Sequence, residues 1–246
     1  MHYLALATDY DGTIAHHGAV DEPTLAALER LRQTGRTLIL ITGRILDELH
    51  VVCPRLDLFD RVVAENGALL YNPATGAQRL LADPPPTDFA RLLRSRGVDR
   101  IVQGRVIVAT WVPHQTTAAA LIDELQLPLQ VILNKDAVMV LPRGVDKATG
   151  LAAAVADLGL TPQQTIGIGD AENDQTFLAL CGFSAAVANA LPELKQHVDQ
   201  VTSGHHGAGV CELIQTWLDG QLIPLRPPTP PPPSSQKDHD TPPPPQ

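Results

Sequence analysis

Two aspartates in the segment DYDGT, residues 9–13, directly follow the first apolar run of the chain. Residues two apart in an extended segment point to the same side, so the carboxylates of Asp9 and Asp11 are predicted to converge. Two carboxylates this close repel each other, and a divalent cation relieves the repulsion. A carboxylate can also attack phosphorus, while its neighbour protonates the leaving oxygen and then deprotonates water. Alone, the pattern is equally typical of a polar turn.

Three later segments carry polar residues of complementary chemistry. Thr42, in the sequence TGR, can offer a hydroxyl group and nearby backbone N–H groups to a phosphoryl oxygen. Lys147 begins a predicted helix, where the macrodipole disfavours a cation unless an anion such as Asp9 or a bound phosphate compensates. Asp170 and Asp174, in the sequence GDAEND, are oxygen ligands that suit magnesium better than zinc. Taken singly, these segments are explained by a turn, a solvated lysine and an acidic helix start.

Each of these segments follows or adjoins an element of a predicted parallel sheet. Near-continuous apolar runs separated by helical patterns are typical of a sheet that is covered on both faces. We therefore predict an α/β fold with a Rossmann-like parallel-sheet core, in which the site lies at the carboxyl ends of the strands. The predicted strands of this core are residues 3–8, 37–41, 61–64 and 165–169.

The middle of the chain has a different pattern, with an Asn66-Gly67 hairpin signal and helices mixed with short strands. Helices are predicted at 87–96 and 114–125, and strands at 129–133 and 137–141. Between Thr42 and Lys147 lie 104 residues, far more than one crossover needs. The sequence therefore predicts an inserted α+β cap domain. The predicted boundaries are 1–66 and 142–223 for a discontinuous core and 67–141 for the cap.

The composition excludes several classes of protein. The chain has 246 residues, a formal net charge of −9 and an aromatic content of 4%, which argues against nucleic-acid binding. Three isolated cysteines form no disulfide framework, and no apolar run is long enough for a membrane span, so a cytoplasmic protein is expected. Residues 224–246 hold 11 of the 22 prolines and are expected to be disordered, with or without a partner that recognises proline.

The two histidine pairs, at 16–17 and 205–206, do not predict a zinc site. Adjacent histidines do not easily bind one ion together, and no cysteine or carboxylate in their segments completes a zinc set. The glycine-rich segment after Thr202 is expected to pack near the site as a loop.

Together, the four segments in this order resemble the haloacid dehalogenase-like superfamily, whose motifs are DxDGT, Ser or Thr, Lys, and GDxxND. The resemblance extends to about residue 222. It implies that Asp9 is the nucleophile, that Asp11 is the general acid and base, and that Thr42 and Lys147 hold the phosphoryl group. Dehalogenases of the superfamily lack the second aspartate, so the presence of Asp11 indicates a phosphate ester as substrate.

The same resemblance implies a set of binding residues. Mg²⁺ ligands are expected to be Asp9, Asp11 through its backbone carbonyl, Asp170 and Asp174. Substrate-binding residues are expected to be Thr42, Gly43, Arg44, Asn66, Lys147 and Asn173. The place of the insertion resembles the C2-capped IIB or Cof-type branch, and its short length resembles phosphoglycolate-phosphatase-like members. In the cap, Arg105, His114 and Lys135 are candidate contacts for the leaving group, although each is more typical of a surface residue.

The sequence thus favours a magnesium-dependent phosphomonoester hydrolase that acts through an aspartyl-phosphate. Its expected substrate is a small phosphorylated metabolite, either a sugar phosphate or a molecule like phosphoglycolate. Two alternatives remain at this stage. The first is a phosphomutase or phosphotransferase of the same fold, and the second is a non-catalytic scaffold that docks through its proline-rich tail.

Overall fold

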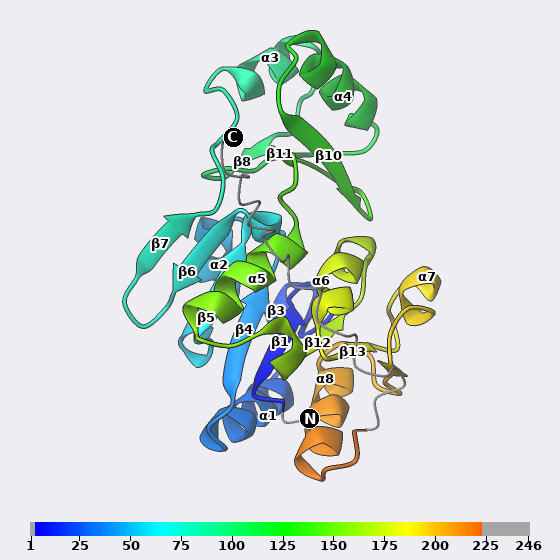
Figure 1. Ribbon diagram of the computed structural model, residues 1–246. Coiled ribbons are helices and arrows are strands. Elements are labelled where there is room, and N and C mark those ends of the chain that lie inside the picture. Colours follow the sequence, from blue (N-terminus) through cyan, green and yellow to red (C-terminus); the bar gives the residue numbers. More distant parts are fainter. Residues whose placement is uncertain (1–2, 223–246) are drawn as a thin grey trace, which may run out of the picture.

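The computed structural model describes residues 3–222. They form a large lower unit built around one sheet and a smaller upper unit inserted into it (Figure 1). The predicted proline-rich tail, 224–246, lies outside the described residues. None of the helices in the described part of the chain is both long and apolar enough to cross a membrane.

The central sheet has eight strands in the order β14-β13-β12-β1-β4-β5-β6-β7. The pairs from β14 to β5 are parallel, whereas β5–β6 and β6–β7 are antiparallel. The predicted parallel-sheet core is therefore confirmed. Its strands are β1 (Ala5–Asp9), β4 (Thr37–Ile41), β5 (Arg61–Ala64), β6 (Leu69–Asn72), β7 (Ala77–Leu80), β12 (Thr165–Gly169), β13 (Phe183–Ala186) and β14 (Gln200–Val201).

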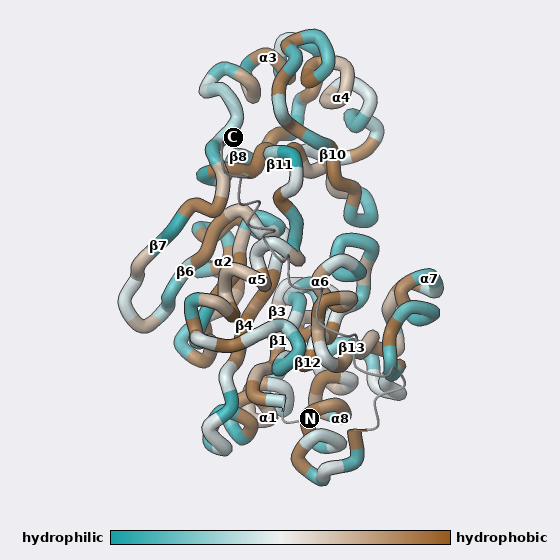
Figure 2. Tube along the Cα trace, viewed as in Figure 1, coloured by the Kyte–Doolittle hydropathy of each residue, from teal (hydrophilic) through white to brown (hydrophobic). Residues whose placement is uncertain are grey.

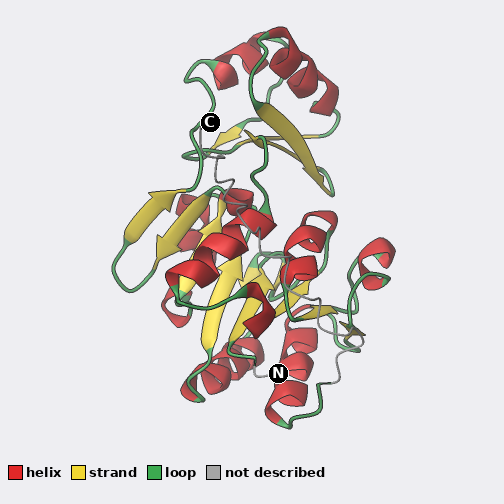
Figure 3. Ribbon diagram, viewed as in Figure 1, coloured by secondary structure: helices red, strands yellow, loops and turns green. Residues whose placement is uncertain are grey.

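Helices cover both faces of this sheet, which explains why its inner strands are continuously apolar (Figures 2 and 3). Every residue of β1 and of β12 is buried. The helices α1 and α8 pack together, and α5 packs over β4, β5 and β6 beside α6. Their bounds are α1 (Glu22–Gln33), α2 (Leu46–Val52), α5 (Lys147–Asp157), α6 (Gln175–Leu180), α7 (Pro192–Lys195) and α8 (His206–Leu218).

The upper unit has its own antiparallel sheet in the order β10-β11-β9-β8 and its own apolar core. Two helices lie on the side of this sheet that faces away from the lower unit, so its other side faces the carboxyl ends of the central strands (Figure 3). The elements are α3 (Phe89–Ser95), β8 (Val102–Gln103), β9 (Val108–Trp111), α4 (Gln115–Glu124), β10 (Leu129–Asn134) and β11 (Ala137–Pro142).

Two details of the sequence prediction differ from the structure. The hairpin of β6 and β7 pairs with β5, with Val62 opposite Tyr71, so the boundary predicted at residue 67 falls before the last two strands of the central sheet. A hairpin signal specifies two antiparallel strands but not the sheet that they join. The segment after Thr202 is a loop only as far as His205, because α8 begins at His206. It does lie near the 9–13 turn, since His206 Nδ1 is 2.9 Å from the carbonyl oxygen of Gly12.

Candidate active site

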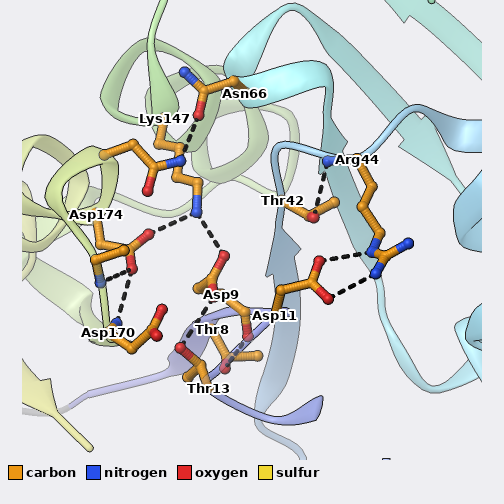
Figure 4. Close-up of polar contacts among 12 residues, drawn as sticks. Thr8, Asp9, Asp11, Thr13, Thr42, Arg44, Asn66, Lys147, Asp170 and Asp174 are labelled. Carbon is orange, nitrogen blue, oxygen red and sulfur yellow. Dashed lines mark hydrogen bonds and ion pairs between the residues drawn. The ribbon is translucent and has the colours of Figure 1, made fainter. Parts of the chain in front are cut away.

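Three aspartates meet at the carboxyl ends of β1 and β12 (Figure 4). Asp9 ends β1, and Asp170 follows β12, which pairs directly with β1. Asp174 lies at the end of the short 3₁₀ helix η4 (Glu172–Asp174). All three are buried, and one carboxylate oxygen from each lies within 4.8 Å of the other two. This is the convergence that parallel strands impose on residues at their ends.

Lys147 lies between two of these carboxylates. Its Nζ is 2.5 Å from Asp9 Oδ1 and 2.6 Å from Asp174 Oδ1, and the side chain is 1% exposed. A capping box formed by Asp146 and Thr149 fixes the start of α5 and so places Lys147 in its first turn. Burial alone would lower the pKa of Lys147, but the two carboxylates raise it above its ordinary value. The two carboxylates therefore favour the charged form of Lys147.

One lysine does not balance the negative charge of the cluster. Burial raises the pKa of Asp9 to about 8, although Lys147 opposes this shift. Burial also raises the pKa of Asp170, whose Oδ1 is buried and has no hydrogen-bond partner among the described residues. Converging carboxylates with an unpartnered oxygen fit a hard divalent cation, which favours their ionised form. Asp9, Asp170 and Asp174 could therefore hold a metal ion.

The turn after β1 fits closely against Asp170. Gly12 has a φ of +88°, and a Cβ at this position would lie 2.2 Å from Asp170 Oδ2. Only glycine combines this backbone conformation with this approach. Thr13 donates its hydroxyl hydrogen to Asp9 Oδ2 at 3.0 Å, which fixes the orientation of the Asp9 carboxylate. The backbone N–H groups of Asp170 and Ala171 hold Asp174 Oδ2 in the same way, at 2.8 and 3.0 Å.

The side chain of Asp11 points away from the three carboxylates and toward Arg44 (Figure 4). Arg44 Nε and Nη2 donate to its two oxygens at 2.6 and 2.8 Å. Thr42 is 1% exposed and lies beside this pair, with its Oγ1 accepting the backbone N–H of Arg44 at 3.1 Å. Asp9 and Asp11 are thus two residues apart in the chain but have different partners. Asp9 contacts Lys147 and Thr13, whereas Asp11 pairs with Arg44. The side chain of Asp11 does not belong to the carboxylate cluster that could hold a metal.

The structure brings Asn66 and Asn173 together beside this centre. Asn173 Nδ2 donates to Asn66 Oδ1 at 2.9 Å, and both side chains are buried. They line a separate cavity of about 300 Å³, whereas Thr42, Gly43 and Arg44 line the main cavity above Asp9. Five of the six predicted substrate-binding residues therefore divide between two cavities, and Lys147 lines neither of them.

The three candidates in the upper unit have different surroundings. Lys135, in the turn between β10 and β11, reaches down so that its Nζ is 2.7 Å from Asp170 Oδ2. Lys135 is exposed, as expected of a surface residue, yet its amine reaches the carboxylate cluster, because this turn lies over the site. Arg105 pairs with Asp47 of the lower unit at 3.2 Å, and the ring of His114 is 3.5 Å from Asp99.

Sequence reasoning missed Glu65, which joins the two units. Glu65 is fully buried, and its carboxylate accepts the backbone N–H groups of Arg105, Val106 and Ile107 at 2.9, 2.7 and 2.9 Å. A Cβ at Gly104 would lie 2.6 Å from the same carboxylate. The sequence Glu65-Asn66-Gly67 was interpreted as a hairpin signal and as similar to the C2-capped branch, with no role for the glutamate itself. The one signal in the sequence was in the segment 103–105, Gln-Gly-Arg, which lies beside Glu65 in the structure. Its glycine marks a point where another part of the chain approaches closely.

Replacement of Glu65 with Ala is expected to destabilise the protein by about 3 kcal/mol, because two buried N–H groups and one part-buried N–H group lose their acceptor. Glu65→Gln is expected to lose less stability, since the amide keeps one carbonyl oxygen that can accept these hydrogen bonds. Urea unfolding measures both changes. Glu193→Ala, at an exposed glutamate, is the matched control. Equal stability of Glu65→Ala and the control would show that the contact between the units contributes nothing.

The main cavity lies between the two units and has a volume of about 410 Å³. Its lower wall includes Asp9, Asp11 and Thr42, and its upper wall comes from the sheet of the upper unit. A ligand in this cavity would contact the carboxylate centre at one end and the upper unit at the other. The site can therefore hold a small molecule with one end against Asp9.

Comparisons with known proteins agree with this geometry. The family model for haloacid dehalogenase-like hydrolases matches residues 6–95 and 117–214. A phosphoglycolate phosphatase from Methanothermobacter thermautotrophicus is 31% identical over 222 residues, which cover 87% of this chain and 98% of that protein.

Solved structures share the fold at lower identity. A HAD/COF-like hydrolase from Plasmodium vivax superimposes with a TM-score of 0.75 at 20% identity, covering 88% of this chain and 96% of the other. A HAD subclass IIB sugar phosphatase gives a TM-score of 0.71 at 16% identity, covering 89% and 99%. The chain thus belongs to the family of haloacid dehalogenase-like hydrolases, with the fold of its IIB and Cof-type members.

Proposed function

We propose that this protein is a magnesium-dependent phosphomonoester hydrolase that acts on a small phosphorylated metabolite through an aspartyl-phosphate. One observation carries the proposal: Asp9 lies among Lys147, Asp170 and Asp174 and lines the cavity between the two units. The names of the relatives, which are phosphoglycolate phosphatases, support a substrate of this class. Three free cysteines in the described residues are consistent with a reducing, cytoplasmic location.

The metal ion would be held by Asp9, Asp170 and Asp174, together with the backbone carbonyl of Asp11. When bound, it supplies positive charge that offsets the repulsion between the Asp9 carboxylate and the phosphate. The unpartnered Oδ1 of Asp170 supports this assignment. An all-oxygen donor set favours Mg²⁺ over softer metals.

The protein residues would carry the reaction as follows. Asp9, oriented by Thr13, forms a bond to phosphorus while the bond from phosphorus to the ester oxygen breaks. Lys147 and the Thr42 hydroxyl group bind the phosphoryl oxygens and stabilise their charge. Asp11 gives its proton to the leaving oxygen, and then takes a proton from the water that hydrolyses the aspartyl-phosphate.

Asp11 must leave its present partner to perform this role. Both of its oxygens accept hydrogen bonds from Arg44, so neither is available to a leaving group in this arrangement. A substrate that enters the cavity between Asp11 and Arg44 would separate the pair. Arg44 is therefore proposed to contact the substrate, and Asp11 to become the acid when the substrate is bound.

The upper unit is proposed to act as a cap. Its sheet closes the cavity over Asp9, and Lys135 and Glu65 join it to the lower unit. Closure would exclude water that competes with the leaving group for the proton of Asp11. The proposed core then consists of residues 1–66 and 142–223 with the β6–β7 hairpin added, and the cap is the rest of 67–141.

Removal of divalent metal tests this proposal. Phosphate release from a panel of small phosphate monoesters is expected to stop in EDTA and to return when Mg²⁺ is added in excess. Phosphate is measured colorimetrically, and circular dichroism checks that the EDTA-treated protein stays folded. Release at an unchanged rate in EDTA would refute the metal-dependent mechanism.

A further inference from the structure

The upper wall of the main cavity presents a surface that the proposed chemistry does not use. This wall is largely apolar and comes from strands β8, β9 and β11, the end of β10 and the loops beside them. An arginine and a tryptophan stand within it. The residues of the wall are Arg100, Val102, Ile107, Ala109, Trp111, Asn134, Ala137 and Met139.

Arg100 differs from the other cations of the site. Lys147 pairs with Asp9 and Asp174, and Lys135 with Asp170. Arg44 pairs with Asp11, and the nearby Glu48 adds further negative charge beside Arg44. By contrast, no ion pair in residues 3–222 involves Arg100.

The guanidinium of Arg100 is held by an aromatic ring. Its Cζ lies 3.3 Å from the centroid of the Trp111 ring, a stacked arrangement. Stacking orients the guanidinium plane and leaves the N–H groups at its edge free to donate. Such an edge matches the two oxygens of a carboxylate, or two oxygens of a phosphate.

We propose that Arg100 determines specificity by binding a second anionic group of the substrate, at the end remote from the phosphate that Asp9 attacks. The substrate class is a phosphate monoester with a carboxylate or second phosphate, joined by carbon atoms that lie against the apolar wall. The inference rests on the function proposed above. It adds to that function a named residue and a charge requirement on the leaving group.

Matched substrate pairs test the inference. 3-Phosphoglycerate and glycerol 3-phosphate differ only in a carboxylate, and fructose 1,6-bisphosphate and fructose 6-phosphate differ only in a phosphate. The wild-type enzyme is expected to favour the anionic member of at least one pair in kcat/KM. Which pair shows the preference distinguishes a carboxylate from a second phosphate.

Substitution of Arg100 should remove that preference. Arg100→Ala and Arg100→Gln are expected to lower kcat/KM for the preferred anionic ester about ten- to a hundredfold, mainly through KM. For the matched ester that lacks the second anionic group, kcat/KM is expected to change less than about twofold. Arg100→Lys should retain part of the preference, and Trp111→Ala should weaken it while Trp111→Phe preserves most of it.

The control is Arg94→Ala, at an exposed arginine of the same unit. Thermal unfolding of each variant separates loss of fold from loss of binding, and Arg100→Gln replaces Arg100→Ala if the latter is unstable. Equal effects on both members of each pair, or none, would overturn the role of Arg100. Absence of magnesium-dependent release from every ester in the wild type would instead refute the proposed function itself.

Discussion

Replacement of Asp9 with Asn is expected to reduce kcat for phosphate release by about 10³-fold or more, the largest loss expected from any single substitution in this chain. An amide nitrogen and oxygen occupy the same volume as the carboxylate, but neither attacks phosphorus. A loss of this size corresponds to about 4 kcal/mol of transition-state stabilisation. Steady-state release of phosphate from the best ester in excess Mg²⁺ measures it.

Asp9→Asn is a clean test because the fold should tolerate it. Asp9 lies within 4.8 Å of two other buried carboxylates, so loss of its charge relieves repulsion in the metal-free protein. The amide can still accept the Thr13 hydroxyl hydrogen. The control is Asp219→Asn, because Asp219 lies at the C-terminal end of α8 and does not belong to the carboxylate cluster. Retention of more than a tenth of wild-type kcat by Asp9→Asn would mean that another residue is the nucleophile.

Much of this site was predictable from the sequence because the constraint is topological. Asp9 and Asp170 end or follow buried strands, and parallel neighbouring strands place such residues at one edge. Lys147 was predictable because a lysine in the first turn of a helix needs an anion nearby. These arguments depend on strand order and local propensity, which the pattern of apolar residues reveals.

The contacts between the two units were not predictable in the same way. Glu65 and Lys135 each directly follow a strand, but their partners lie more than 30 residues away, and the local sequence does not show which way either side chain points. The pairing of the β6–β7 hairpin with β5 depends on which sheet has a free edge. Arg100 and Trp111 become neighbours only when the loop before β8 meets β9. Such contacts depend on how the insertion folds back, and local periodicity carries no information on that.

Lys147→Met is the second substitution with a large expected effect. Unlike Asp9→Asn, it should lower the stability of the protein as well as its activity. Methionine fills the space of the lysine stem but leaves Asp9 and Asp174 buried without their shared cation. Breaking a buried pair in this way costs about 3–5 kcal/mol. The variant is therefore expected to lose phosphatase activity in excess Mg²⁺, as measured by phosphate release. It is also expected to lose stability in EDTA, as measured by urea unfolding.

The control for Lys147→Met is Lys195→Met, because Lys195 Nζ donates to the backbone carbonyl of Ala188 and, within residues 3–222, pairs with no carboxylate. Mg²⁺ is expected to restore part of the stability of Lys147→Met, since a cation bound by Asp9 and Asp174 replaces some of the missing charge. It should not restore activity, because Lys147 is also proposed to bind the phosphoryl oxygens. Wild-type kcat in Lys147→Met would contradict that role.

The double variant Asp9→Asn with Lys147→Met separates the two functions of the lysine. If Lys147 stabilises the fold by neutralising Asp9, removal of both charges should cost less than the sum of the two single changes in unfolding free energy. Asp174 still loses its partner, so recovery should be incomplete. Additive losses in EDTA would mean that Lys147 acts on Asp174 alone. The activity of the double variant should stay at the level of Asp9→Asn, because a phosphoryl-binding lysine has nothing to stabilise once the nucleophile is absent.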